Sequence, residues 1–242
     1  MTAATQETPD MNASRVFRRS RRAALAAALL TVLGTGLALA HGNEGGVQIA
    51  GASPAPFGLN PAYHILVVHF PIALWMVAYL FILYRTFSNG ELAVRLQKSV
   101  WPLIFLGSLA GILAYGLGLL IYPWSAITES PLGRNHIILA TWTLSYWIVI
   151  GSIGYRFRRH LYEGGQRWIT FALATIGAAV TAITGTLGGS LAGTPSLVTK
   201  SLGLIGWNVY MTFYLPTWML FLYGAGAVLL VGIGLYGRRS GV

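Results

Sequence analysis

The stretch AYHILVVHFPIALWMVAYLFILY, from Ala62 to Tyr84, is an apolar run long enough for a helix to cross a bilayer. It contains two histidines, His64 and His69, and one proline, Pro71. An imidazole is costly to place in hydrocarbon, so a histidine inside a membrane span is a functional candidate by default. This stretch therefore predicts a membrane helix and supplies the first candidate site residues.

The rest of the chain extends this pattern. Apolar residues make up 55% of the sequence and charged residues only 9%, whereas a soluble domain needs far more surface charge. Four more apolar stretches follow the first, at 99–122, 135–155, 168–188 and 215–237. We predict an all-α fold, a polytopic transmembrane bundle of five spans over residues 62–242, with an outer interfacial segment at 190–214. The sequence shows no evident internal repeat.

The N-terminal region has the pattern of a targeting segment. A basic run from Arg15 to Arg22 precedes an apolar run from Ala23 to Ala40. This order is typical of a secretory signal, and the apolar run is also long enough to remain as an anchor helix. We therefore predict a signal sequence or anchor helix over residues 1–40 and a flexible outer lead-in over 41–61, which is rich in glycine and proline.

The positive charges predict the orientation. With the unprocessed N-terminus in the cytoplasm, all but Arg134 and Lys200 of the 16 lysines and arginines fall on the cytoplasmic side. The positive-inside rule then places both termini in the cytoplasm of a bacterial inner membrane, with the histidines of the spans towards the periplasm. Topology and the lipid bilayer account for the net charge of +10, so no nucleic-acid partner is predicted.

The sequence argues against several chemistries. It contains no cysteine, which excludes thiol catalysis and covalent c-type haem attachment. None of its six acidic residues lies in a predicted span, so a proton pump would lack the usual buried carboxylate. We find no nucleotide-binding or hydrolase motif. An electron-transfer or structural subunit is therefore favoured over a stand-alone enzyme.

Three histidines fall in the same half of the predicted bundle. His64 and His69 lie in the first span, and His136 lies at the start of the third. A separation of five residues turns His64 and His69 in different directions, so one of them facing His136 is the better geometry. We predict that His69 and His136 ligate the iron of a b-type haem and that His64 supports the outer edge of the site. Electrons would then pass between quinone and a periplasmic cytochrome.

Small residues form stripes on two of the predicted helices. Such stripes are typical of close helix packing in membranes, and they also give a macrocycle room beside a helix. The packing candidates are Gly107, Gly111 and Gly118 in the second span and Gly177 and Gly185 in the fourth.

Two other functions remain open on this evidence. The first is a cofactor-free membrane subunit that anchors or stabilises a larger complex, such as a set of respiratory subunits. The second is copper or zinc binding on the outer face, through His41, His64 or His136.

The first span also resembles a known signature. The run from His64 to Leu74, HILVVHFPIAL, is similar to the His-x-x-x-Val-His-Phe-Pro-Ile pattern of the bacterial membrane family called domain of unknown function 2231. The resemblance covers about residues 62–200, with His136 at the third-helix histidine and Gly188-Gly189 at a glycine pair. Ile65 replaces the proline of the family, and the last span is an addition. The resemblance implies the membrane-bundle architecture and an association with cytochromes.

Overall fold

The computed structural model describes residues 59–157, 160–206, 208–211 and 217–236. The predicted signal or anchor helix at 1–40, most of the lead-in and His41 lie outside this part of the chain. The described residues form helices and contain no strand, which confirms the all-α prediction.

The first two long helices form a hairpin. Helix α2 runs from Pro61 to Phe87 and starts at an N-cap, where the Asn60 Oδ1 accepts a hydrogen bond from the Ala62 N–H at 2.8 Å. Helix α3 runs from Glu91 to Ile121. It begins well before the predicted span at 99, because Glu91 favours the positive end of the helix dipole and pairs with Arg95 one turn later.

A second hairpin follows after the short helix α4, which runs from Trp124 to Thr128. Helix α5 runs from Pro131 to Phe157, and helix α6 runs from Gln166 to Leu191. The buried Arg134 side chain ties α5 to α4, since its Nε donates to the Thr128 carbonyl oxygen at 2.5 Å. The cation thus satisfies a carbonyl at the negative end of a helix.

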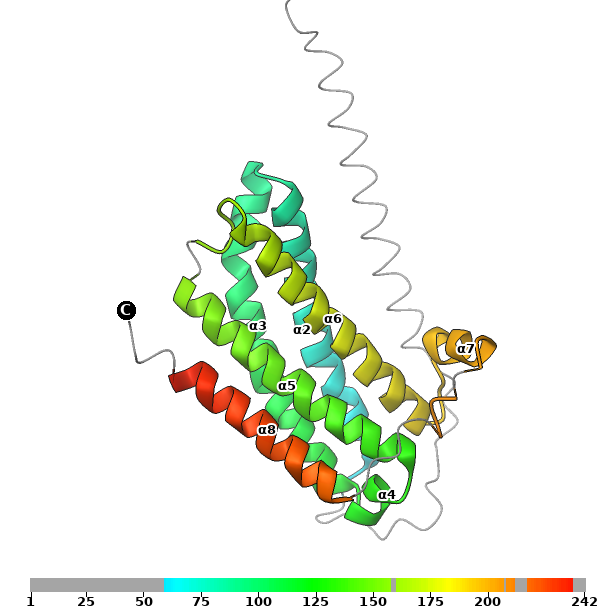
Figure 1. The fold of residues 1–242 in the computed structure, drawn as a ribbon. Helices are drawn as coiled ribbons and strands as arrows, with labels where there is room; N and C mark the ends of the chain where they lie inside the picture. Colours follow the sequence, from blue (N-terminus) through cyan, green and yellow to red (C-terminus); the bar gives the residue numbers. More distant parts are fainter. Residues whose placement is uncertain (1–58, 158–159, 207, 212–216, 237–242) are drawn as a thin grey trace, which may run out of the picture. The chain divides into compact units, whose positions relative to one another are not determined.

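Two further helices complete the described chain. Helix α7, from Leu197 to Leu204, lies in the segment predicted at the outer interface, and helix α8 runs from Thr217 to Tyr236 alongside α5 (Figure 1). Aromatic contacts attach α8, including Trp142 of α5 against Tyr223. Helices α2, α3, α5 and α6 are long and apolar enough to cross a membrane, whereas the apolar stretch of α8, Trp218–Ile233, is shorter. Four of the five predicted spans thus meet this measure.

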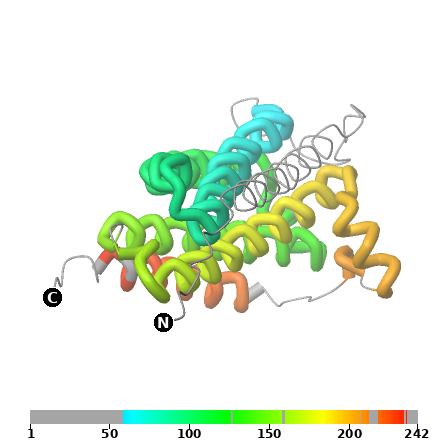
Figure 2. The backbone as a smooth tube through the Cα atoms, turned by 90° about the horizontal axis from the view of Figure 1, so that it is seen from above, coloured from blue at the N-terminus to red at the C-terminus, as the bar shows by residue number. Residues whose placement is uncertain are grey.

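In the packing of the two hairpins, each helix of one hairpin contacts one helix of the other. Besides the pairs within each hairpin, α2 contacts α6 and α3 contacts α5, and Figure 2 shows this grouping from above. The buried core lies where the four helices meet and includes Trp75, Ile104 and Trp147. Many large apolar side chains elsewhere point outwards, as expected for helices solvated by lipid.

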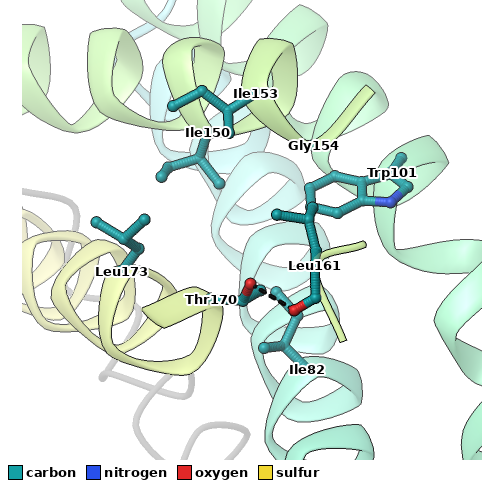
Figure 3. Close-up of a pocket in the computed structure, with 8 residues that line it drawn as sticks. All are labelled: Ile82, Trp101, Ile150, Ile153, Gly154, Leu161, Thr170 and Leu173. Carbon is teal, nitrogen blue, oxygen red and sulfur yellow. Dashed lines mark hydrogen bonds between the residues drawn. The ribbon is translucent and has the colours of Figure 1, made fainter. Parts of the chain in front are cut away.

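We call the end of the four helices that carries Arg85 and Arg156 the arginine end, and the opposite end, with His64 and His136, the histidine end. An apolar cavity of about 20 Å³ lies towards the arginine end (Figure 3). Trp101 lies across Gly154 there, and the Thr170 hydroxyl donates to the Leu161 carbonyl at 2.8 Å. The cavity is too small for a cofactor, so the candidate site must lie elsewhere.

Candidate functional site

His64 is held against the second helix of its own hairpin. Its Nδ1 lies 3.0 Å from the Ala114 carbonyl oxygen, and a methyl group added at Gly118 would lie 2.9 Å from its Cε1. The Tyr122 ring meets the imidazole edge-on, with ring centroids 5.7 Å apart. When Nδ1 carries the proton and donates to a carbonyl, Nε2 keeps a lone pair for a metal or another donor.

His136 occupies the corresponding place in the second hairpin. A methyl group added at Gly188 of α6 would lie 2.9 Å from the His136 Cε1, the same distance and the same ring atom as for His64. The His136 ring faces the backbone of Thr184 and lies within electrostatic range of His64. Its Nδ1 is buried and has no hydrogen-bond partner among the described residues.

The two hairpins repeat one set of contacts. On the first helix of each hairpin, a histidine lies eleven residues before a buried tryptophan. On the second helix, the glycine that contacts the tryptophan lies eleven residues before the glycine that contacts the histidine. The Trp75 and Trp147 rings stack on each other at 5.6 Å with an interplanar angle of 9°, as residues related by a two-fold axis would. The two sets are His64, Trp75, Gly107 and Gly118, and His136, Trp147, Gly177 and Gly188.

The expectation that the chain has no internal repeat is therefore wrong. Few positions are identical between the hairpins, because lipid-facing residues need only be apolar and can vary freely. The positions that match are those where a ring lies on a helix backbone, and only glycine leaves room for this. A comparison of glycine-to-glycine and histidine-to-tryptophan spacings would have found the repeat.

The three candidate histidines of the spans have different surroundings. His64, rather than His69, lies near His136. His69 is exposed on the surface of α2, and its Nδ1 lies 2.6 Å from the Ile65 carbonyl oxygen in the preceding turn. The cause is the rotation between the two positions, since His64 points to α3 and the site while His69 points out of this contact.

The remaining predicted packing glycines lie at contacts between helices. A methyl group at Gly111 would lie 3.0 Å from Trp75 and from Leu144 of α5. Gly185 of α6 is less crowded, with Ile72 of α2 at 3.8 Å from an added methyl group. The glycine stripes therefore serve both contacts within a hairpin and contacts between hairpins.

The histidine end contains few groups that bear charge. Burial raises the pKa of the Tyr122 phenol, so this side chain stays neutral at physiological pH. Arg134 is the buried cation of this end. Among the described residues, no group of three or more histidine, cysteine or acidic side chains is placed to hold a metal ion. The described part of this end thus presents two imidazoles, one from each hairpin.

Comparison with known proteins identifies one family. Residues 60–201 match the family described as "Predicted membrane protein (DUF2231)", a range that contains both hairpins and the first part of α7 but not α8. No curated protein and no solved structure matches the chain.

Proposed function

The chain belongs to the DUF2231 family of predicted membrane proteins, and we propose that its four long apolar helices form an electron-transfer core in the membrane. The protein is a b-type haem electron-transfer subunit of the bacterial inner membrane. His64 and His136 are the axial ligands, in place of the predicted pair His69 and His136. Electrons pass between the quinone pool and a periplasmic cytochrome or another respiratory subunit.

The equivalence of the two imidazoles supports this proposal. His64 and His136 come from different hairpins, their rings lie on glycines in the same way, and they are electrostatic neighbours. Two histidines on separate helices are the ligand set that a six-coordinate b-type haem requires. A bound haem would supply one-electron redox chemistry at this position.

The residues around each ring supply the second shell that a ligand histidine needs. The Ala114 carbonyl holds the Nδ1 of His64 and thereby fixes the ring and leaves Nε2 as the ligand atom. His136 faces the backbone of Thr184, and Ala114 and Thr184 stand four residues before their respective glycines.

The proposed orientation follows the charges of the same helices. Arg85, Arg95, Lys98, Arg156 and Arg167 lie at the arginine end or in its connections. With that end in the cytoplasm, the histidine end lies towards the periplasm and its soluble carriers. The sparse charge of the bundle suits electron transfer without coupled proton pumping.

The test is a reduced-minus-oxidised absorption spectrum of the protein purified in detergent, with haem quantified against protein. We expect a b-type α-band at about one haem per chain. His64→Ala and His136→Ala should each lose most of the bound haem, and His69→Ala should keep it as the matched control. Full haem content in either of the first two variants would overturn the ligand assignment.

A cofactor-free membrane subunit is the second candidate. The supporting observation is that the two imidazoles already fill the space over Gly118 and Gly188, so the core is packed without an added group. In this case, the folded protein supplied with haem would give a featureless spectrum and would co-purify with stoichiometric partner subunits.

Copper or zinc binding is the third candidate. Two imidazoles with His41 would supply three nitrogen ligands at the periplasmic face. Metal analysis of His41→Ala separates this candidate from haem, because His41 has no role in haem ligation. Loss of stoichiometric metal in this variant would favour the metal site.

A further inference from the structure

The repeat is broken at the contacts between the hairpins. On one side, the Tyr115 hydroxyl of α3 and the Thr141 hydroxyl of α5 form a hydrogen bond of 2.8 Å. Thr141 also donates to the Ile137 carbonyl in the preceding turn at 2.7 Å. A phenol ring thus fills the contact between α3 and α5, and its hydroxyl meets a polar group on α5.

The opposite contact, between α2 and α6, has different residues at the same places. His69 stands five residues after His64, as Thr141 stands five after His136. Gly185 stands three residues before Gly188, as Tyr115 stands three before Gly118. The second hairpin therefore has no phenol ring to place against α2.

His69 and Gly185 lie at the same contact. Ile72 is one turn after His69 on α2, and it is the side chain nearest to a methyl group added at Gly185, at 3.8 Å. Since no other side chain of the described residues lies within 4 Å of that position, these residues leave room for a ring beside Gly185, where Tyr115 provides one in the other hairpin.

His69 offers an unused polar atom to the lipid. Its Nδ1 bonds to the Ile65 carbonyl, and its Nε2 has no hydrogen-bond partner among the described residues. The neighbouring Leu66 and Phe70 are 62% and 59% exposed, so the imidazole opens onto an apolar surface. An imidazole about 10 Å inside a span is costly unless something bonds to it.

We propose that His69 and Gly185 form a binding site for the headgroup of a membrane quinol. The quinol ring takes the place that the Tyr115 ring has in the other hairpin, and its hydroxyl donates to the Nε2 of His69. A quinol has the two features that the contact lacks, a flat ring and a phenolic hydroxyl, and it arrives through the lipid to which His69 is exposed. The site deepens the proposed electron-transfer role, on which its biological use rests.

The experiment is anaerobic photolabelling of the full chain in nanodiscs of phosphatidylethanolamine and phosphatidylglycerol, with a reduced azido-ubiquinone (the azido-ubiquinol) as the probe and peptide mapping as the readout. We expect labelling of α2 or α6 near His69 and Gly185, and unlabelled decylubiquinol should compete with it. Gly185→Tyr supplies the missing ring, and it should reduce this labelling at least tenfold. Gly224→Tyr on α8, where an added Cβ has no atom of the described residues within 4 Å, is the matched control and should label as wild type does.

A second variant keeps the proposal testable if Gly185→Tyr does not fold. His69→Leu removes the acceptor of the quinol hydroxyl, and it should reduce labelling about tenfold. Wild-type labelling in a folded His69→Leu or Gly185→Tyr variant would overturn the site. Labelling that decylubiquinol does not displace would also overturn it, because it indicates a general lipid contact. Haem content in the same samples shows separately whether the proposed function fails.

Discussion

The two hairpins place the same rings on the same glycines but satisfy their polar atoms differently. In the second, the Trp147 Nε1 donates to the Thr181 hydroxyl at 2.9 Å. In the first, Gly111 takes the position of Thr181, and the buried Trp75 Nε1 has no partner among the described residues. Both hairpins thus pack their rings against a helix backbone, but they differ in the hydrogen bond of the tryptophan N–H.

The largest difference between the hairpins is expected at the glycines beneath the tryptophans. A methyl group at Gly107 would lie 2.6 Å from the Trp75 Nε1, whereas one at Gly177 would lie 3.0 Å from Trp147 and Tyr146. Overpacking of this kind costs about 1–3 kcal/mol, so Gly107→Ala should lie at the upper end and Gly177→Ala at the lower. Thermal unfolding in detergent, followed by circular dichroism, measures both. Equal destabilisation by the two substitutions would mean that both glycine–tryptophan contacts tolerate an added methyl group equally well.

The next largest effect is expected from removing the hydrogen bond between Trp147 and Thr181, which the first hairpin lacks. Thr181→Val keeps the shape of the side chain and leaves the buried Trp147 Nε1 without an acceptor, which should cost about 1–2 kcal/mol. Combining it with Trp147→Phe should recover part of this cost in a double-mutant cycle, because no indole N–H then remains unsatisfied. Additive effects in the cycle would show that the bond contributes nothing to the second hairpin.

A smaller effect is expected at the contact between the hairpins. Tyr115→Phe removes the hydrogen bond to Thr141 but keeps the ring, so the free energy of unfolding should fall by about 1 kcal/mol. The haem spectrum should stay unchanged, since the ring lies outside the histidine pair. Thr141→Val provides the reciprocal variant, and a loss much larger than that of Tyr115→Phe would point to an added role for the Thr141 hydroxyl.

The smallest effect on stability is expected at Tyr162, which lies in the connection between α5 and α6. Burial raises the pKa of Tyr162 well above its usual range, although the Arg85 guanidinium opposes the shift. Because the folded state holds this proton more tightly, stability is full below about pH 10 and falls as pH rises further. Tyr162→Phe should change stability by less than about 1 kcal/mol at pH 7 and should flatten the alkaline decline, as measured by unfolding between pH 8 and 11. If the stability of the variant falls with pH as it does in the wild type, other groups cause the alkaline loss of stability.

The sequence predicts the architecture of this chain better than its site. Long apolar runs such as Ala62–Tyr84 need only hydropathy to be recognised, so the helices of the core follow directly. Prolines at 61 and 131 begin α2 and α5, and they bring His64 and His136 to similar distances from the helix starts.

The choice of His69 as the partner of His136 shows what sequence leaves undetermined. Depth along a helix follows from residue number, but the direction of a side chain depends on which neighbour the helix packs against. Only the contact of His64 with Gly118 reveals that direction. The Leu117-Gly118 and Leu187-Gly188 pairs carried this information in the sequence, yet they are too short to stand out in an apolar background.

The repeated unit contains two crossings, an even number, and this has a consequence for how the chain enters the membrane. Each copy starts and finishes on the same side, so a duplicated hairpin needs no inversion to join the first. In the orientation proposed above, Arg85 in the first copy and Arg156 in the second give each hairpin its own positive-inside signal. The translocation machinery can therefore insert the halves one after the other, each oriented by charges that it carries itself.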